Sequence, residues 1–208
     1  MIAVLDYGAG NLRSVELGFA RLGVATAITR DPAEMARADG LVLPGVGAFA
    51  DAMAALNASG VVAPLRELVA AGKPLFGICL GMQALFESSE EGPGVAGLGL
   101  IPGTVRRLPA VGLKIPHMGW NAITPQKDSP LLRGLPAACY VYFVHSYACF
   151  AADRADVLVT AEYGTVFDAA VQRGNVIGMQ FHPEKSGAVG QRILQNFVEL
   201  TQKEAGTC

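Results

Sequence analysis

The sequence predicts a single mixed-sheet α/β domain over residues 1–208. In the first half of the chain, short apolar runs alternate with segments whose apolar residues recur at helical spacing, which is typical of a parallel sheet covered on both faces. After about Gly92, strand-like segments follow one another more closely. The chain is 51% hydrophobic and 16% charged, which suits one well-filled core, and no shift in composition marks a linker.

The first half is expected to begin with a strand at Ile2–Leu5 and the glycine turn Tyr7-Gly8-Ala9-Gly10. We expect Asn11 to cap a helix of regular apolar spacing that ends at Gly23. The pair Asp31-Pro32 has the residue types that begin a second helix. The remaining elements predicted here are strands at residues 24–28, 41–43 and 74–79, with two helical stretches before the last strand.

The second half is expected to consist mainly of strands. Its window 134–152 lacks Asp, Glu, Lys and Arg and is long enough to cross a bilayer, but Pro136, His145 and several tyrosines favour a buried strand with turns at each end. The predicted elements are strands at residues 99–108, 120–124, 140–147, 157–162 and 176–179, a hairpin turn at 173–175 and a closing helix at 189–203.

Composition excludes several classes of partner and cofactor. The net charge of −2 and the absence of a basic cluster argue against nucleic acid, and the N-terminus lacks the form of a signal peptide. The cysteines form no CxxC pair and have no histidine at zinc-ligand spacing, so neither a metal site nor a disulfide framework is expected, and the location is predicted to be cytoplasmic. Gly8-Ala9-Gly10 lacks the third glycine of a dinucleotide fingerprint, which excludes that cofactor site.

The segment Gly77-Ile78-Cys79-Leu80-Gly81 places a cysteine at the predicted junction of a strand and a helix. In a nucleophile elbow, flanking glycines permit a sharp turn that holds the nucleophile above the sheet, and the next amide, here that of Leu80, faces an oxyanion. The helix N-terminus favours the thiolate form. The alternative is that Cys79 is a small buried core residue.

Two further segments carry groups that suit the same chemistry. His182 and Glu184 are two residues apart in Gln180-Phe181-His182-Pro183-Glu184-Lys185, so in an extended chain they lie on one side, as a base and the group that orients it. A surface His-Pro-Glu turn is the alternative. Pro44-Gly45-Val46-Gly47-Ala48-Phe49 ends the third predicted strand, and its glycines allow amides to turn toward an oxyanion, although an ordinary glycine turn fits equally well.

Together these segments resemble the class I, or triad, glutamine amidotransferases. Within that family the chain is most similar to the glutaminase subunits of imidazole glycerol phosphate synthases, from histidine biosynthesis. The narrower resemblance runs from end to end of the chain, and its most specific segment is Pro116-His117-Met118-Gly119-Trp120-Asn121. The segments that carry it are residues 6–12, 43–49, 77–83, 116–121, 142–147 and 180–186.

The resemblance implies a flavodoxin-like open sheet with helices on both faces, no cofactor, and hydrolysis of glutamine to glutamate and ammonia through a γ-glutamyl thioester. It also implies a separate (β/α)8-barrel cyclase subunit as the partner that receives the ammonia. The residues to which it assigns roles are Cys79, His182 and Glu184 as the catalytic triad, Val46, Gly47 and Leu80 around the oxyanion, and Gln83, Ser146 and Tyr147 around the substrate.

Other residues and other functions stay open on the sequence alone. His145 is a rival for the role of base, but it lies in an apolar strand and lacks a carboxylate two residues on. His117 is expected to be structural or at the partner interface, and Cys139, Cys149 and Cys208 to be structural or incidental. The rival functions are an ester hydrolase of the α/β-hydrolase type, a glutaminase serving aminodeoxychorismate or pyridoxal phosphate synthesis, and a degenerate binding subunit.

Overall fold

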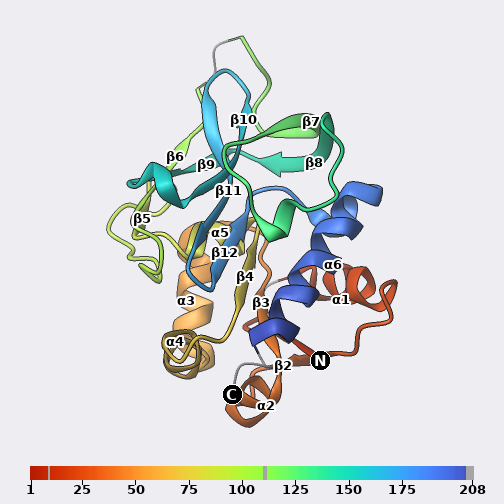
Figure 1. The fold of residues 1–208 in the computed structure, drawn as a ribbon. Helices are drawn as coiled ribbons and strands as arrows, with labels where there is room; N and C mark the ends of the chain where they lie inside the picture. The colour runs from red at the N-terminus through yellow and green to blue at the C-terminus, as the bar shows by residue number, and fades with distance from the viewer. Residues whose placement is uncertain (9, 110–111, 205–208) are drawn as a thin grey trace.

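The computed structural model describes residues 1–8, 10–109 and 112–204. Ala9 of the predicted glycine turn and Cys208 lie outside the described residues. Figure 1 shows two parts, a sheet flanked by helices below and a group of crossing strands above. The elements of the first part are β1 (Ile2–Leu5), α1 (Leu12–Ala20), β2 (Thr26–Thr29), α2 (Pro32–Arg37), β3 (Gly40–Leu43), α3 (Phe49–Ser59), α4 (Val62–Ala70), β4 (Leu75–Ile78) and α5 (Leu80–Ala84).

The second part contains most of the remaining chain, and the last strand and helix return to the first part (Figure 1). Its elements are β5 (Ser88–Ser89), β6 (Gly103–Arg107), β7 (His117–Pro125), β8 (Cys139–His145), β9 (Tyr147–Ala151), β10 (Val157–Glu162), β11 (Val166–Arg173), β12 (Val176–Met179) and α6 (Gly187–Glu204), with 3₁₀ turns at Pro130–Leu132, Arg154–Asp156 and Pro183–Lys185.

The strands form one continuous sheet in the order β2-β1-β3-β4-β12-β11-β10-β7-β8. The first five strands pair in parallel and the next four are antiparallel, so the mixed sheet predicted from the sequence is confirmed. The order of the parallel strands matches the 2-1-3-4-5 order of flavodoxin-like sheets. In such a sheet, ligands bind beyond the carboxyl ends of the strands, and Cys79 and Gln180 here follow directly after β4 and β12.

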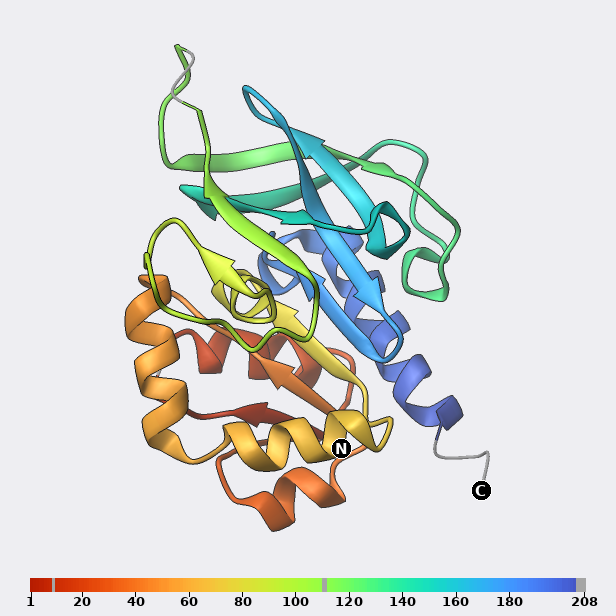
Figure 2. The ribbon, with the colours of Figure 1, turned by 90° about the vertical axis from the view of Figure 1, so that its left-hand side faces the viewer.

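Helices cover both faces of the parallel strands, and each face has its own core (Figure 2). Alternate residues of β1 point to opposite sides: Ile2 and Val4 pack with α1 and α6, whereas Ala3 and Leu5 pack with α2, α3 and α4. The phenylalanines Phe19 and Phe76 each pack against Phe197 with tilted rings in the first of these cores. Because both faces are buried, the strands read as continuous apolar runs in the sequence.

The predicted strand at 140–147 is wrong in one respect. The structure divides this stretch at Ser146 into β8, which pairs with β7, and β9, which pairs with β6 and β11. The chain changes partner strands there, and an unbroken ladder cannot serve two partners that run in different directions. Other boundaries shift by a few residues, and the short strand β5 was not predicted. Within the part of the chain that the structure describes, no helix is both long and apolar enough to cross a membrane.

Candidate active site

Cys79 sits in a strained backbone conformation between β4 and α5. Its φ of 55° and ψ of −111° place it among the few described non-glycine residues with positive φ, as expected for a nucleophile elbow. The flanking glycines are required by space: a Cβ atom at Gly81 would lie 1.8 Å from the carbonyl oxygen of Leu43, and one at Gly77 would lie 2.8 Å from that of Gly81. Backbone packing therefore fixes the position of the thiol.

His182 and Glu184 form a buried hydrogen-bonded pair just after β12. Nδ1 of His182 donates to Oε1 of Glu184 over 2.8 Å, and both side chains are 1% exposed. Among the described residues, Nε2 of His182 is one of the buried polar atoms that have no hydrogen-bond partner, and His182 lines the same cavity as Cys79. A buried ring nitrogen left free beside a thiol is the arrangement that a general base needs.

The charges of this pair are set by their neighbours. Burial alone lowers the pKa of His182, but the Cys79 thiol and the Glu184 carboxylate outweigh burial and raise the pKa to about 9. Burial likewise raises the pKa of Glu184, and the bonds from His182 and Asn11 outweigh it, so that the pKa is lowered. The site therefore favours an imidazolium next to a carboxylate at neutral pH.

Asn11 is a residue of the site whose role the sequence did not indicate. The prediction that it caps α1 is wrong: its φ is 74°, and its side chain makes no capping bond. Instead, its Nδ2 donates to Oε1 of Glu184 over 2.8 Å, across 173 residues of chain. A capping residue has extended backbone geometry, whereas the left-handed conformation of Asn11 turns its amide toward the carboxylate.

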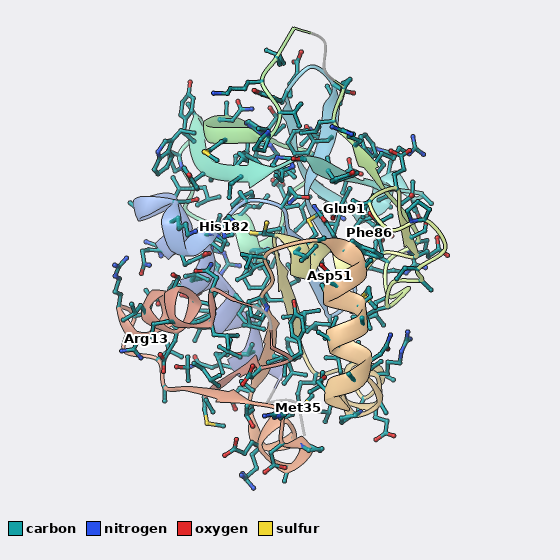
Figure 3. The ribbon with its side chains drawn as sticks, turned by 180° about the vertical axis from the view of Figure 1, so that it is seen from behind. Arg13, Met35, Asp51, Phe86, Glu91 and His182 are labelled. Carbon is teal, nitrogen blue, oxygen red and sulfur yellow. The ribbon has the colours of Figure 1, made fainter. Side chains whose placement is uncertain are left out.

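A cavity of about 280 Å³ lies at the carboxyl ends of the parallel strands, in front of Cys79. It brings together all of the residues predicted for the site except Glu184, which lies behind His182. Figure 3 labels His182 and Glu91, both from this cavity, and shows Met35 toward the other end of the molecule. The lining residues are Val46, Gly47, Cys79, Leu80, Gln83, Glu91, Pro116, Val144, His145, Ser146, Tyr147 and His182.

The predicted oxyanion segment lies on one wall of this cavity. Gly47 has a φ of 102°, a conformation that favours glycine. Val46 lies close to the loop before α1: a Cβ atom added at Gly10 would lie 3.2 Å from the Val46 side chain. Tyr7 supports the segment by donating from its hydroxyl to the carbonyl oxygen of Pro44 over 2.8 Å. The hydroxyl is inside the protein, and burial, followed by the charge of Cys79, raises the pKa of Tyr7.

The opposite wall carries Gln83, from α5. Its Nε2 donates to the carbonyl oxygen of Tyr147 and to Oε1 of Gln180, each over 3.0 Å, so both of its amide hydrogens are used by the protein. Gln180 is fully buried, and its own Nε2 lies 3.8 Å from Sγ of Cys79. No sequence feature indicates a role for Gln180 apart from its place two residues before His182.

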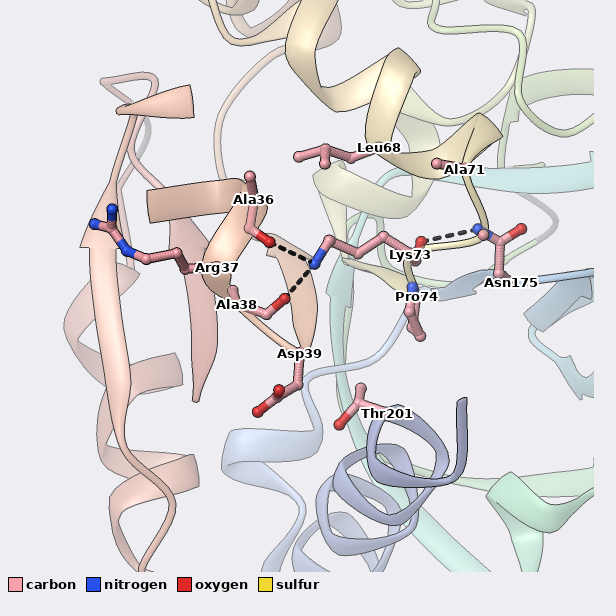
Figure 4. A pocket seen from close by; sticks show the side chains of 11 residues that line it. Ala36, Arg37, Ala38, Asp39, Leu68, Ala71, Lys73, Pro74, Asn175 and Thr201 are labelled. Carbon is pink, nitrogen blue, oxygen red and sulfur yellow. Dashed lines mark hydrogen bonds between the residues drawn. The ribbon is translucent and has the colours of Figure 1, made fainter. Parts of the chain in front are cut away.

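A larger hollow, of about 540 Å³, lies at the other end of the parallel strands and contains none of the predicted site residues (Figure 4). Its central cation, Lys73, donates to the carbonyl oxygens of Ala36 and Ala38 at the end of α2. Asn175 donates to the carbonyl oxygen of Lys73 over 2.8 Å. These bonds satisfy the last carbonyls of a helix, which is a structural role.

The other described cysteines, Cys139 and Cys149, and the histidine His145 differ from Cys79 and His182 in their surroundings. Cys139 and Cys149 are free and buried, in keeping with the structural role predicted for them. His145 lines the cavity but is hydrogen-bonded at both ring nitrogens, to Tyr147 and to His117. It therefore has no nitrogen free to accept a proton from Cys79, unlike His182.

The strained cysteine, the buried His-Glu pair and the flavodoxin-like sheet define a class of protein. The chain matches the family profile described as "Glutamine amidotransferase class-I" over residues 3–200, and it belongs to this family. A solved structure described as "Crystal structure of glutamine amidotransferase" has the same fold, with a TM-score of 0.76 and 23% identity, and the match covers 97% of this chain and 98% of that one.

Relatives with higher sequence identity narrow the family assignment to one kind of subunit. "Imidazole glycerol phosphate synthase subunit HisH" of Moorella thermoacetica is 53% identical over 97% of this chain and 95% of that protein. The protein of the same name from Methanosarcina barkeri is 51% identical over 96% of this chain and 98% of its own length. Within the class-I family, the chain thus belongs with these HisH subunits, as a glutamine amidotransferase subunit of the enzyme.

Proposed function

We propose that the chain hydrolyses glutamine to glutamate and ammonia with Cys79 as the nucleophile, His182 as the general acid and base, and Glu184 as the group that orients His182. The observation that carries the proposal is the buried geometry of the three side chains. Cys79 is held in a strained elbow, Nε2 of His182 is free in the same cavity, and Nδ1 is bonded to Glu184 over 2.8 Å.

In the first step, Sγ of Cys79 attacks the carboxamide carbon of glutamine, and the carbonyl oxygen becomes an oxyanion. Backbone amides near Val46, Gly47 and Leu80, which line the cavity, are proposed to stabilise that oxygen. The imidazolium of His182 then gives its Nε2 proton to the amide nitrogen. The C–N bond breaks, ammonia leaves, and a γ-glutamyl thioester remains on Cys79.

In the second step, neutral His182 takes a proton from a water molecule, and the resulting hydroxide attacks the thioester carbon. The tetrahedral intermediate collapses to the γ-carboxylic acid and the Cys79 thiolate, and His182 is again protonated. The acid releases its proton to water and leaves as glutamate. Gln83, Ser146 and Tyr147 are proposed to hold the amino-acid end of the substrate. They lie on the cavity wall formed by α5 and the β8–β9 junction.

The ammonia is proposed to pass to a separate (β/α)8-barrel cyclase subunit. That subunit uses it to form imidazole glycerol phosphate and an aminoimidazole carboxamide ribotide in histidine biosynthesis. Support comes from the HisH relatives, whose shared name makes them one subunit of a synthase. Ammonia protonates in bulk water, so a second protein that covers the cavity keeps it reactive.

The surface beside the cavity suits such a partner. β7 and β8 turn apolar and aromatic side chains outward, and Met118, Trp120 and Tyr140 are 63%, 57% and 57% exposed. Trp120 lies against Tyr142, whose carbonyl oxygen accepts a hydrogen bond from the backbone nitrogen of His182. A group of exposed aromatic residues is typical of an interface, and this one adjoins the proposed base.

Glutamate release from glutamine tests the proposal. It is measured with the chain alone, then with a purified barrel cyclase and its ribotide ligand, with Cys79→Ala as the control. We expect strong activity that depends on the cyclase and its ligand and that disappears in the variant. Glutaminase activity that the cyclase does not change would support glutamine hydrolysis by this chain but reject the cyclase of histidine biosynthesis as its partner. The absence of activity with any synthase would favour a degenerate binding subunit.

A further inference from the structure

Two buried histidines form a continuous hydrogen-bonded chain behind the cavity wall. Nδ1 of His145 lies 2.8 Å from the carbonyl oxygen of Tyr147, and its Nε2 lies 2.9 Å from Nδ1 of His117. Nε2 of His117 lies 3.4 Å from Nδ2 of Asn121. Both rings are almost fully buried, so these contacts are their main polar partners.

The chemistry of the partners fixes where the hydrogens are. The carbonyl oxygen of Tyr147 can only accept, so Nδ1 of His145 must carry a hydrogen. In a neutral ring, Nε2 of His145 is then an acceptor, and the hydrogen between the rings belongs to Nδ1 of His117. Burial lowers the pKa of His145 to about 3 and that of His117 to about 4, which keeps both rings neutral at pH 7.

The chain of bonds joins two separate surfaces. At one end, His117 and Asn121 line an open groove of about 630 Å³ between β7 and the β10–β11 turn, together with Trp120, Glu162 and Tyr163. We call it the β7–β10 groove. At the other end, His145 and Tyr147 line the cavity in front of Cys79. The two histidines are thus the wall between the groove and the cavity.

From Tyr147 the bonds continue to the nucleophile. The same carbonyl oxygen accepts from Nε2 of Gln83, whose other hydrogen goes to Gln180, and Nε2 of Gln180 faces Sγ of Cys79 at 3.8 Å. The carbonyl belongs to the first residue of β9, directly after the break at Ser146. The ladder of β7 with β8 ends at His145, and the ladder of β6 with β9 begins at Tyr147. The bond from His145 to the Tyr147 carbonyl therefore adds a direct side-chain link between the end of β8 and the start of β9.

We propose that His117 and His145 are positioning residues, each in the Nδ1–H tautomer, which together fix the Tyr147 carbonyl and through it the Gln83 side of the glutamine cavity. This pair of histidines, here called the histidine relay, also links the β7–β10 groove to the glutamine cavity, because His117 lines the groove and His145 lines the cavity. The inference rests on the proposed function, because it assigns a purpose to a wall of the proposed glutamine cavity.

The tautomers are directly measurable. The protein has three histidines, so selective ¹⁵N labelling of histidine gives three rings to assign. At pH 7 we expect two neutral rings protonated at Nδ1, from His117 and His145, and a third ring, that of His182, with both nitrogens protonated. Protonation of either relay ring at Nε2, alone or with Nδ1, overturns the proposal. This readout needs no enzymatic activity.

Two variants of His117 separate the hydrogen bond from the packing of its ring. His117→Phe keeps an aromatic ring to stack on Tyr163 and Phe143 but removes the donor to His145. His117→Asn loses the stacking but places an amide nitrogen where Nδ1 was. Thr124→Ala, an exposed change in the same strand, is the matched control.

Kinetics are measured with the cyclase complex and saturating ligand. We expect His117→Phe to raise the KM for glutamine about tenfold with kcat changed about twofold at most, as for one displaced binding group. His117→Asn and the control should stay within about threefold of the wild-type KM. Equal effects of the Phe and Asn variants, or an unchanged KM in the Phe variant, overturn the positioning role. A wild-type complex without glutaminase activity rejects the proposed function instead. In that case the ¹⁵N measurement of the tautomers alone tests the hydrogen bonds proposed for His117 and His145.

Discussion

The two sides of the candidate active site are held in place by different means. On the nucleophile side, close backbone packing around Gly77 and Gly81 fixes Cys79. The contacts of its thiol with Nε2 of Gln180, at 3.8 Å, and with the carbonyl oxygen of Val144, at 4.0 Å, are long. On the base side, polar side chains from distant parts of the chain hold His182 and Glu184. The nucleophile is therefore positioned by excluded volume, which tolerates no added atoms, and the base by directional bonds, which can be removed one at a time.

This difference predicts which property a substitution will change. A substitution on the nucleophile side acts on folding first, because the elbow is part of the contact between β4, α5 and the end of β3. Removal of a hydrogen-bonding side chain on the base side leaves the backbone in place and acts on the charge or direction of His182. The predictions that follow test this division, from the largest expected effect to the smallest.

Gly81→Ala should abolish the native fold or nearly so. The new Cβ would lie 1.8 Å from the carbonyl oxygen of Leu43, and backbone on both sides prevents relief. We expect a loss of more than about 4 kcal/mol in the free energy of unfolding, measured by urea denaturation. Gly60→Ala is the matched control: its φ is 77°, with no atom within 4 Å of the added Cβ, so about 1–2 kcal/mol is expected. Similar losses for the two variants would contradict the excluded-volume account.

Glu184→Gln should leave the fold intact and remove most of the activity. The amide keeps the size of the carboxylate but not its charge, so His182 loses the partner that helps to raise its pKa. We expect kcat/KM for glutamine to fall on the order of 10⁴-fold, as in other triads that lose the orienting carboxylate. The pKa of His182, followed by NMR, should fall below about 9. An unchanged pKa with normal activity would remove Glu184 from the site.

Asn11→Gly should have a smaller effect in the same direction. Glycine accepts the φ of 74° at this position, so the substitution removes the bond to Glu184 without adding backbone strain. We expect kcat/KM to fall about tenfold, the effect of one hydrogen bond to a charged group. Asn57→Gly tests a similar change at an exposed position in α3 and should leave kcat/KM unchanged. If both variants kept full activity, Asn11 would have no positioning role.

The dependence of stability on pH extends the comparison to all three buried histidines. In the folded protein, burial lowers the pKa of His117 to about 4 and that of His145 to about 3, below the ordinary 6.5. Below pH 6.5 the unfolded chain therefore binds more protons at these two rings than the folded chain does. The free energy of unfolding should therefore fall from pH 6.5 toward 4, by at most roughly 1.4 kcal/mol per pH unit for each ring. His182 has the opposite sign: its contribution is complete below 6.5 and is lost as the pH rises through about 9.

Urea denaturation at several values between pH 5 and pH 10 measures both limbs. The expected curve declines on the acid side and again on the alkaline side. In His117→Asn, the acid limb should become shallower, because one of the two neutral rings is gone. A curve that is flat between pH 7 and pH 5 would show that the buried histidines titrate normally.

The same division explains what the sequence could predict. The elbow at Cys79, the apolar strands and the alternation of strands with helices in the first half follow from local spacing, and the structure confirms the mixed sheet. The bond from Asn11 to Glu184 does not, since local rules favour a helix cap for an asparagine before an apolar helix, and only the fold brings in a carboxylate 173 residues away. Tertiary contact decided against the local preference.

The break at Ser146 was hidden for a related reason. The stretch at 140–147 has no Asp, Glu, Lys or Arg and is rich in β-formers, which predicts one strand, but composition does not say which neighbouring strand each half pairs with. The pairing of β8 with β7 and of β9 with β6 is a property of the assembled sheet. Likewise, the sequence does not indicate that His117 and His145 touch. Their contact follows from the register that places them opposite each other in β7 and β8.

The most direct test of the central claim is labelling with a glutamine-analogue electrophile, followed by peptide mapping of all four cysteines. Cys139 and Cys149 serve as internal controls, because burial raises the pKa of each of these thiols and neither lines the cavity. We predict one label per chain, on Cys79, with excess glutamine slowing the reaction. Labelling of another cysteine in the folded protein, or a rate that glutamine does not change, would contradict the assignment of this cavity as the glutamine site.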